Sequence, residues 1–330
     1  MERYEPPYHI TNTMLALVAE IAEKTGRIAS YRSFEAKPHL RRNNRIRSIH
    51  SSLAIEANSL SMDEVKGVID GKAVIGPQKE IQEVKNAYEA YDMLGGFDPY
   101  SLKDIQRLHG VMTYLTVQES GVFRTRNEGV FNGDVCIFMA PPPQLVPSQM
   151  QALFAWLREE KDKVHPLILS SIFHYEFVFI HPFSDGNGRM ARLWQTALLT
   201  KWREIFQYLP IESQIEKDQA GYYKAIADCH SAGKSDVFIE YMLRQIDKAF
   251  TDILKQASAK EGQISEYVGR LLDVMEYDVP YTANQIMEKL GIKSRESLRK
   301  NYLHPAIELN LVQMTDPEKP RSRNQRYVKR

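Results

Sequence analysis

The sequence of 330 residues contains only two cysteines, Cys136 and Cys229, and neither belongs to a Cys-x-x-Cys pair or lies at ligand spacing from a histidine. This scarcity argues against a disulfide framework and against a zinc site. Long apolar runs are missing too, since no stretch approaches the roughly 18 consecutive apolar residues of a membrane helix. The first residues, MERYEPPYHI, lack the basic start and the apolar run of a signal peptide, so we expect a cytoplasmic protein without a membrane partner.

An excess of either charge is also missing. The chain has 43 Lys and Arg against 42 Asp and Glu, a formal net charge of +1, so the molecule as a whole has no electrostatic bias toward nucleic acid. Residues 289–330 differ, with 11 Lys and Arg against 4 Asp and Glu, so such a bias is local. What is abundant is apolar material, 43% of residues with 10% aromatic, which is sufficient for the core of a soluble globular protein.

Apolar residues recur at helical spacing along most of the chain. The pattern predicts helices over residues 12–24, 39–57, 61–70, 79–94, 101–115, 166–180, 189–203, 216–229 and 235–258. Gly26 is expected to end the first helix, Ser61 and Glu64 form a capping box, and Ser101 caps another helix. The chain is therefore expected to be mostly α-helical.

One segment breaks this pattern. Asn132 and Gly133 separate two short β-type runs, Val130–Phe131 and 135–138, and Asn-Gly is the strongest short signal for a hairpin. An isolated hairpin is only marginally stable, so we expect this one to lie on the helical body.

The sequence pattern changes again after about residue 262. A helix over 282–290, a turn at Gly291, a capping serine at Ser294, a helix over 295–309 and two β-type runs predict a small winged helix-turn-helix domain. Its basic residues make duplex DNA a candidate partner of residues 282–330, with protein and RNA as alternatives.

The stretch HPFSDGNGRMAR, residues 181–192, contains a histidine, an aspartate, two glycines and two arginines between two apolar segments. The glycines lie where a helix begins, and the free N–H groups of a helix N-terminus favour an anion such as phosphate. Arg189 and Arg192 share one helix face, and guanidinium groups suit phosphate oxygens. Asp185 beside them predicts a divalent cation, and His181 suits a base that accepts a proton from a hydroxyl.

Each of these residues also has an ordinary structural interpretation. A histidine that follows an apolar helix is often a packed or capping residue, and Asp-Gly and Asn-Gly are often only turns. An EF-hand loop is not supported, because its alternating acids and closing glutamate are missing. A Rossmann or P-loop site is not supported either, because neither GxGxxG nor GxxxxGK[ST] occurs. The combination of residues, rather than any single one, favours nucleotide chemistry.

The stretch resembles the motif HxFx(D/E)GNGRxxR of the Fic family at every specified position, and the likeness extends over roughly residues 40–245. The resemblance implies a Fic-type helical bundle with a β-hairpin flap, and transfer of AMP from ATP, with Mg²⁺ or Mn²⁺, to a hydroxyl on a target protein or on the chain itself. It implies the following roles: His181 as general base, Asp185 as metal ligand, Gly186, Asn187 and Gly188 as anion hole, and Arg189 and Arg192 as holders of the β- and γ-phosphates. Phe183 is expected to anchor the loop.

Two further segments gain roles from this resemblance. The flap would bind a target segment by main-chain pairing along Val135, Cys136, Ile137 and Phe138, unless the hairpin merely covers the core. Tyr222 and Tyr223 would lie near ATP, with one of them stacking near the adenine, unless they are ordinary core aromatics.

The segment SSLAIEAN, residues 51–58, resembles the inhibitory helix motif (S/T)xxxE(G/N) of the family, with Ser52 and Glu56 at the fixed positions. Glu56 would pair with Arg192 and so remove a phosphate ligand, unless it is an exposed surface glutamate. Ala57 stands where Gly or Asn is usual, so we expect Asn58 to cap the helix one position late.

The resulting organisation has a helical region with the inhibitory motif over 1–100, a Fic catalytic core over 101–258 and a winged helix-turn-helix domain over 259–330. The expected function is an autoinhibited protein adenylyltransferase, and the resemblance leaves open whether the same pocket also removes AMP. One alternative is a kinase similar to Doc toxins, although these carry a lysine where this chain has Gly188. The other is a DNA-binding regulator on a Fic-like scaffold, and a homo-oligomer is compatible with all of these interpretations.

Overall fold

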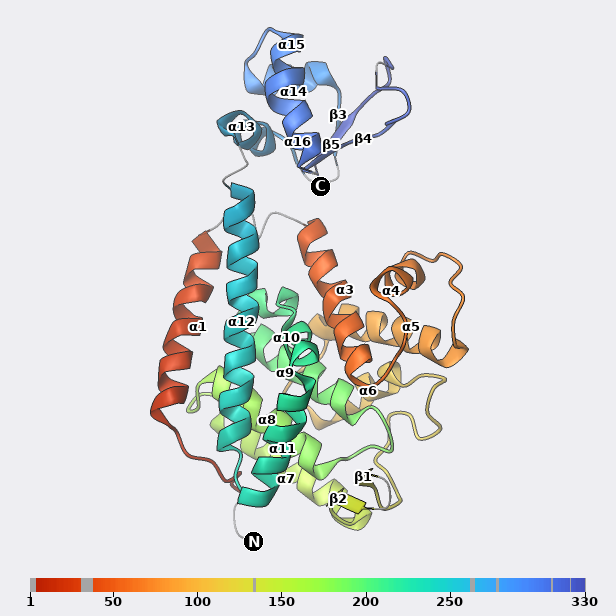
Figure 1. Ribbon diagram of the computed structural model, residues 1–330, viewed down its shortest axis with the longest axis vertical. Coiled ribbons are helices and arrows are strands. Elements are labelled where there is room, and N and C mark those ends of the chain that lie inside the picture. The colour runs from red at the N-terminus through yellow and green to blue at the C-terminus, as the bar shows by residue number, and fades with distance from the viewer. Residues whose placement is uncertain are drawn as a thin grey trace. The chain divides into compact units, whose positions relative to one another are not determined.

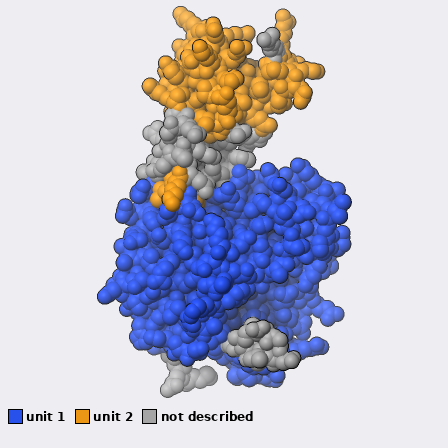
Figure 2. Space-filling model, in the orientation of Figure 1, with its two compact units in different colours: residues 1–27, 41–252 blue, residues 28–40, 253–330 orange. Residues whose placement is uncertain are grey.

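A computed structural model of the chain describes residues 4–30, 38–132, 135–261, 265–276, 279–309, 311–320 and 322–329 (Figure 1). The chain divides into two compact units, residues 1–27 with 41–252 and residues 28–40 with 253–330, which Figure 2 colours separately. Within the described ranges, no helix is both long enough and apolar enough to cross a membrane.

Helices make up most of the first unit, and some of them run across its boundary. In chain order they are α1 (Asn12–Ser30), α3 (Pro38–Ile55), α4 (Met62–Ile69), α5 (Gln78–Asp92), α6 (Leu102–Met112), α7 (Val146–Glu160), α8 (Pro166–Ile180), α9 (Asn187–Trp202), α10 (Ile211–Lys217), α11 (Gln219–Ala232) and α12 (Asp236–Glu261). Short 3₁₀ turns cover Met93–Gly96, Pro143–Leu145 and Glu204–Tyr208.

Helices α8 and α9 form the centre of this unit and pack against each other more extensively than any other pair of described elements. Residues 167–177 of α8 and 189–199 of α9 are all buried. A helix buried on every side passes through the interior rather than along the surface. The loop that joins the two helices, residues 181–186, is therefore held at both ends by the core.

Helix α1 lies beside α12 (Figure 1). The Thr11 hydroxyl donates to Glu240 over 2.8 Å, and Lys24 Nζ donates to Asp247 over 2.5 Å. The prediction that Gly26 ends the first helix is wrong, because α1 continues to Ser30. Glycine inside a helix costs only about 1 kcal/mol, and Ile28, which is 2% exposed, lies beyond it.

The predicted helix starts at two serines are confirmed. The Ser61 hydroxyl accepts from the Glu64 backbone N–H while the Glu64 carboxylate accepts from the Ser61 N–H, which is the complete capping box. Ser101 caps α6 by accepting from the Asp104 N–H.

The predicted hairpin is present as two antiparallel strands, β1 (Gly129–Asn132) and β2 (Val135–Met139), which follow α6 in the chain. Val130 pairs with Phe138, and the register shifts between Val130 and Phe131. Gly133 of the turn and the side chains of 130–138, including those of Val135, Cys136, Ile137 and Phe138, lie outside the described residues.

The second unit contains α13 (Glu266–Val274), β3 (Pro280–Tyr281), α14 (Ala283–Leu290), a helix over 295–308, β4 (Val312–Met314) and β5 (Tyr327–Lys329). The helix over 295–308 consists of α15 (Arg295–Ser297), a π-helical stretch, η4 (Leu298–Leu303), and α16 (His304–Glu308). The sheet has the order β3-β5-β4 with both pairs antiparallel. Gly291, with φ +69°, ends α14, and Ser294 caps the next helix, so the two predicted turn signals are confirmed.

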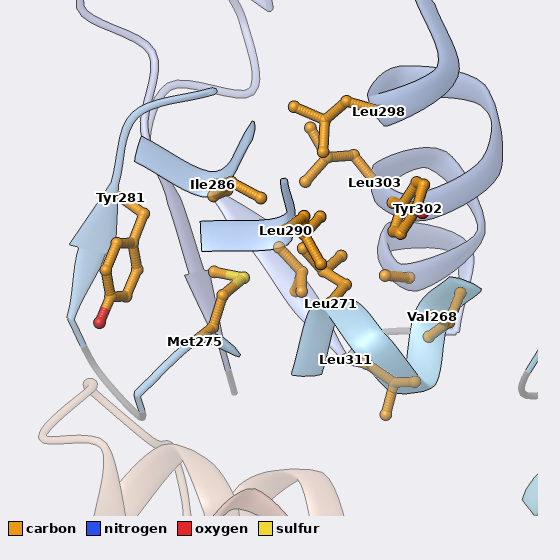
Figure 3. Close-up of a cluster of buried hydrophobic side chains, with 12 residues drawn as sticks. Val268, Leu271, Met275, Tyr281, Ile286, Leu290, Leu298, Tyr302, Leu303 and Leu311 are labelled. Atoms are coloured by element: carbon orange, nitrogen blue, oxygen red, sulfur yellow. The ribbon is translucent and has the colours of Figure 1, made fainter. Parts of the chain in front are cut away.

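This unit has a hydrophobic core of its own (Figure 3). The core joins α13, α14, the helix over 295–308 and the sheet through buried side chains that include Leu271, Ile286, Leu298, Leu303 and Leu311. The order of helix, turn, helix and hairpin on a three-stranded sheet is that of a winged helix-turn-helix.

Candidate active site

His181 directly follows the last residue of α8. Its backbone lies in the left-handed region, with φ 51° and ψ 60°, and its N–H donates to the Phe177 carbonyl. The ring Nδ1 is 3.3 Å from the Val178 carbonyl oxygen. A carbonyl only accepts, so Nδ1 carries the proton of the neutral ring and Nε2 keeps a lone pair. Burial is the largest cause that lowers the pKa of His181 below its usual value, so the ring is neutral near pH 7 and can accept a proton.

Arg124 holds the backbone around His181, and our sequence reasoning missed it. Its side chain is 2% exposed and donates from Nε to the His181 carbonyl over 2.6 Å. The same guanidinium donates to the carbonyls of Arg126 at 2.8 Å and Pro141 at 2.6 Å, which lie on either side of the hairpin. Arg124 thus ties the base of the hairpin to the end of α8. A single arginine between phenylalanine and threonine gives no sequence signal for this role.

The loop after His181 is fixed by Phe183 and Asn187. Phe183 is fully buried, which suits the anchoring role expected of it, and donates its N–H to Asn187 Oδ1 over 2.9 Å. Asn187 Nδ2 returns a hydrogen bond to the Phe183 carbonyl over 2.8 Å. The two bonds close the loop into a turn directly before α9.

His109, on α6, supports the same loop and was also missed. Its ring stacks on Phe183 with centroids 3.6 Å apart. The Gly121 N–H donates to Nδ1 over 2.9 Å, so Nε2 carries the proton and donates to the Asp185 carbonyl over 3.0 Å. Burial lowers the pKa of His109 to about 4, so this support is a neutral histidine near pH 7.

The N-terminus of α9 forms a cradle suited to an anion. Gly186 caps the helix with φ +81°, a conformation that favours glycine. A Cβ atom on Gly188 would overlap the carboxylate of Glu56. The space that glycine leaves open at position 188 is therefore filled by the acid of Glu56, beside the N–H groups at the start of α9.

Arg192 binds this acid. Nη2 donates to Glu56 Oε1 over 2.8 Å and to the Ser52 carbonyl over 2.9 Å, and Nε donates to the Ser52 hydroxyl over 3.1 Å. The Arg192 side chain is 1% exposed and that of Glu56 is 36% exposed. Nη1 of Arg192 is buried and has no hydrogen-bond partner among the described residues. The guanidinium therefore still has a donor to offer to a ligand.

Arg189 also faces carboxylates. Nη2 donates to Asp185 Oδ1 over 3.1 Å, and Nη1 lies 3.5 Å from Glu83 Oε1. Glu83 belongs to α5, and its Oε2 accepts from Asn58 Nδ2 over 2.9 Å. Glu83, a third residue missed by sequence reasoning, thus joins Arg189 to the segment that comes after Glu56.

The end of α3 positions Glu56. The Ala57 N–H donates to the Ala54 carbonyl and the Asn58 N–H to the Leu53 carbonyl, which is a Schellman motif. Ala57 takes the left-handed position itself, with φ +64°. The expectation that Asn58 caps one position late is therefore wrong, because the motif tolerates alanine at the cost of about 1 kcal/mol of strain.

Asp185 lies at the exposed rim, with its side chain 46% accessible. Its Oδ1 accepts from the Gly186 N–H over 2.5 Å, and Oδ2 lies 3.9 Å from Lys79 Nζ. Among the described residues, no three His, Cys, Asp or Glu side chains are grouped so that they could hold a metal ion. A lone exposed carboxylate fits Mg²⁺ only as an ion shared with substrate phosphates, which is the way Mg²⁺ is usually bound.

The two adjacent tyrosines of α11 lie in different places. Tyr222 is 2% exposed, and its hydroxyl is 2.9 Å from His174 Nε2, so it lies in the core. Tyr223 is 48% exposed, and its hydroxyl donates to the Ile55 carbonyl over 3.4 Å. Gln219 Nε2 donates to the same carbonyl over 2.9 Å. Of the two tyrosines, Tyr223 is the one that lies at the end of the Glu56 helix.

Comparisons with known proteins agree with this geometry. Residues 99–199 match the Fic/DOC family, and residues 266–328 match the C-terminal domain of Fic-like proteins, where Fic stands for filamentation induced by cAMP. The chain is similar to a crystal structure of a Fic family protein from Desulfovibrio desulfuricans, with 40% identity, a TM-score of 0.74, and coverage of 99% of this chain and 98% of that one.

Curated relatives are more distant. The protein adenylyltransferase fic-1 of Caenorhabditis elegans is 28% identical over 237 residues, which are 68% of this chain and 41% of that protein. The protein adenylyltransferase Fic of Nematostella vectensis is 29% identical over 208 residues, which are 59% of this chain and 45% of that protein. The chain thus spans less than half the length of these curated relatives.

Proposed function

The chain belongs to the Fic/DOC family and carries a Fic-like C-terminal domain, and we propose that it is a protein adenylyltransferase that moves AMP from ATP to a hydroxyl of a target protein or of itself. The observation that carries this proposal is the carboxylate of Glu56, which lies over Gly188 and bonds to Arg192. An acid held by a helix N-terminus and a buried guanidinium marks a place where an anion is stabilised. ATP phosphate is the anion that the surrounding residues suit.

In the proposed step, the target hydroxyl oxygen attacks the α-phosphorus of ATP. The bond from that phosphorus to the oxygen bridging to the β-phosphate breaks, and pyrophosphate leaves. The hydroxyl proton passes to Nε2 of His181, whose proton on Nδ1 faces the Val178 carbonyl. Arg124 keeps the His181 backbone in place by its bond to the carbonyl of that residue.

The loop and the arginines would hold the triphosphate. Of the three residues assigned to the anion hole, Asn187 and Gly188 lie in the first turn of α9, where the helix favours negative charge, and the N–H of the capping Gly186 donates to Asp185 Oδ1. The forked guanidinium groups of Arg189 and Arg192 suit the β- and γ-phosphates. The free Nη1 donor of Arg192 supports this assignment, because a buried donor without a partner is costly unless a ligand satisfies it.

Asp185 is the residue that would hold Mg²⁺ or Mn²⁺ together with phosphate oxygens of ATP. When bound, the ion neutralises negative charge on the phosphates and on the departing pyrophosphate. The Asp185 backbone is fixed independently of the ion, because His109 donates to its carbonyl.

Glu56 and Ser52 are proposed as the inhibitory elements. With the Glu56 carboxylate over Gly188, the cradle cannot also take a phosphate group, and Arg192 is engaged. Tyr223 is the better candidate of the two tyrosines for contact with adenine, because Tyr222 is buried.

The hairpin is proposed to position the target. In the described residues β2 pairs only with β1, so its other edge has no strand partner, and an extended target segment could pair there. Main-chain pairing along Val135, Cys136, Ile137 and Phe138 would hold the hydroxyl near His181 with little dependence on sequence.

Labelled ATP tests the proposal and separates the alternatives. The chain and its Glu56→Gly variant are incubated with Mg²⁺ and with ATP labelled on the α- or the γ-phosphate. Label on protein from the α-phosphate, stronger in the variant, supports adenylyl transfer. Label from the γ-phosphate alone supports a kinase, and the absence of label from either in both chains supports a scaffold without transferase activity.

A further inference from the structure

The helix over 295–308 combines buried apolar residues with exposed charged ones. Leu298, Tyr302, Leu303 and Ala306 are at most 2% exposed and belong to the core of the second unit (Figure 3). Arg295, Arg299 and Lys300 are exposed, and so is the acid Glu296.

The basic charges of this helix are only partly offset by acids. Among the described residues, neither Arg299 nor Lys300 forms an ion pair with a carboxylate, and the acid Glu308 at the far end pairs with His304 instead. Arg295 Nη2 donates to Asn284 Oδ1 over 2.7 Å, so this residue is anchored on α14. The first half of the helix therefore carries three basic side chains against one acid, Glu296.

A second basic element belongs to the same unit. The loop 315–326 joins β4 to β5, and the Thr315 N–H donates to the Arg326 carbonyl over 3.0 Å while the Arg326 N–H donates to the Thr315 hydroxyl over 3.1 Å. Gln325, 6% exposed, holds the loop from inside through a 2.7 Å bond to the Arg326 carbonyl. The loop exposes Lys319, Arg323 and Arg326, together with Glu318 near its start.

Exposed apolar anchors are missing from the described residues around these basic side chains. Large exposed hydrophobic side chains of the second unit occur at Tyr267 and Val279, and within the described part of 282–329 there are none. Protein interfaces usually depend on a buried aromatic or aliphatic anchor at their centre. Exposed Lys and Arg without such an anchor are typical of surfaces that bind phosphate backbones.

We propose that the helix over 295–308 and the described residues of the loop between β4 and β5, 315–320 and 322–326, form a binding site for double-stranded DNA. The major groove of B-form DNA, which is about 12 Å wide, admits an α-helix, whereas the major groove of duplex RNA is too narrow and deep to admit one. In this arrangement Arg299 and Lys300 reach the groove or its phosphates, and Arg323 and Arg326 bind the phosphate backbone beside it. The site is independent of the transferase chemistry and holds whether or not AMP is transferred.

The test uses the full chain and a fluorescent duplex DNA of random sequence, with affinity measured by anisotropy across a salt series. With about five phosphate contacts, the slope of log K against log salt is about −4.5, so affinity falls about 500-fold between 50 and 200 mM salt. The R299A/K300A and R323A/R326A variants each reduce the magnitude of the slope by about two. The K103A/K201A variant, which removes two exposed lysines of the first unit, is the matched control and leaves it unchanged.

Thermal unfolding of each variant establishes that it is folded, and a duplex RNA of the same length is titrated in parallel. Weaker binding of RNA than of DNA agrees with the proposal. No DNA binding at 50 mM salt, equal loss of affinity in the control variant, or tighter binding of RNA than of DNA overturns it.

Discussion

Replacement of Glu56 by glycine tests the proposed inhibition directly. The substitution removes the carboxylate that lies over Gly188 and that accepts the 2.8 Å hydrogen bond from Arg192. It leaves the Schellman motif at the end of α3 intact, because that motif is made by backbone groups of Leu53, Ala54, Ala57 and Asn58. The variant therefore frees the cradle without dismantling the helix that borders it.

The burial of the two partners sets the size of the effect. An ion pair between exposed groups contributes at most about 1 kcal/mol, and breaking a fully buried pair costs about 3 to 5 kcal/mol. Here the Arg192 side chain is 1% exposed and that of Glu56 is 36% exposed, so the pair is intermediate. A hydrogen bond to a charged group contributes about 1.5 to 3 kcal/mol. At about 1.4 kcal/mol for each factor of ten, we expect the rate of self-modification to rise about 10- to 150-fold.

The assay is the initial rate of label transfer from α-labelled ATP, together with the affinity of each chain for ATP measured by calorimetry. Glu56→Gln is the graded control, because it keeps the size of the side chain and removes its charge, and its rate is expected between those of the other two chains. Glu56→Gly combined with His181→Ala is the inactive control and should still bind ATP. An unchanged rate and an unchanged ATP affinity in Glu56→Gly would refute the reasoning.

Three further predictions concern residues around the site. Glu83→Gln removes a negative charge 3.5 Å from Arg189 but keeps an acceptor for Asn58. In the Glu56→Gly background, calorimetry should therefore show that ATP binds about fivefold more tightly, and weaker binding would contradict the placement of a phosphate at Arg189. Ala57→Gly relieves about 1 kcal/mol of left-handed backbone strain, offset in part by the entropy of glycine in the unfolded chain. Because the end of α3 should then hold Glu56 more firmly, the rate of self-modification should fall about two- to fivefold, and a faster rate would contradict this prediction. The pKa of His109 is about 4 in the folded chain and about 6.5 when unfolded, so between these values the unfolded chain binds more protons and the free energy of unfolding should fall by about 3 kcal/mol as the pH drops. Urea unfolding at pH 7 and pH 4.5 should show a smaller decline in His109→Gln, and an identical decline would exclude His109 as the cause.

The fold was predictable wherever a local pattern decides the structure. The helical spacing of apolar residues predicted a helix over 166–180, and α8 covers Pro166–Ile180. The capping box at Ser61 and the turn at Gly291 depend only on neighbouring residues, and both are confirmed. The prediction that the first helix ends at Gly26 failed because burial of a later residue can extend a helix past a glycine, and Ile28 is buried beyond Gly26.

The site was predictable where its chemistry is contiguous in sequence. His181 and the residues up to Arg192 lie in one short stretch, so their combination pointed to one site. Arg124, His109 and Glu83 come from three separate segments, and each supports the loop or its arginines through a contact distant in sequence. Isolated buried polar residues such as these carry no local signature, because only the folded packing tells which partner satisfies them.

The most direct test of the central claim is the intact mass of the Glu56→Gly chain after incubation with ATP and Mg²⁺. If residues 181–192 bind the triphosphate of ATP so that a hydroxyl attacks the α-phosphorus, the mass of the chain increases by one AMP moiety. The Glu56→Gly/His181→Ala chain then shows no increase. An increase by a phosphate group, or an AMP adduct that persists without His181, would contradict the account.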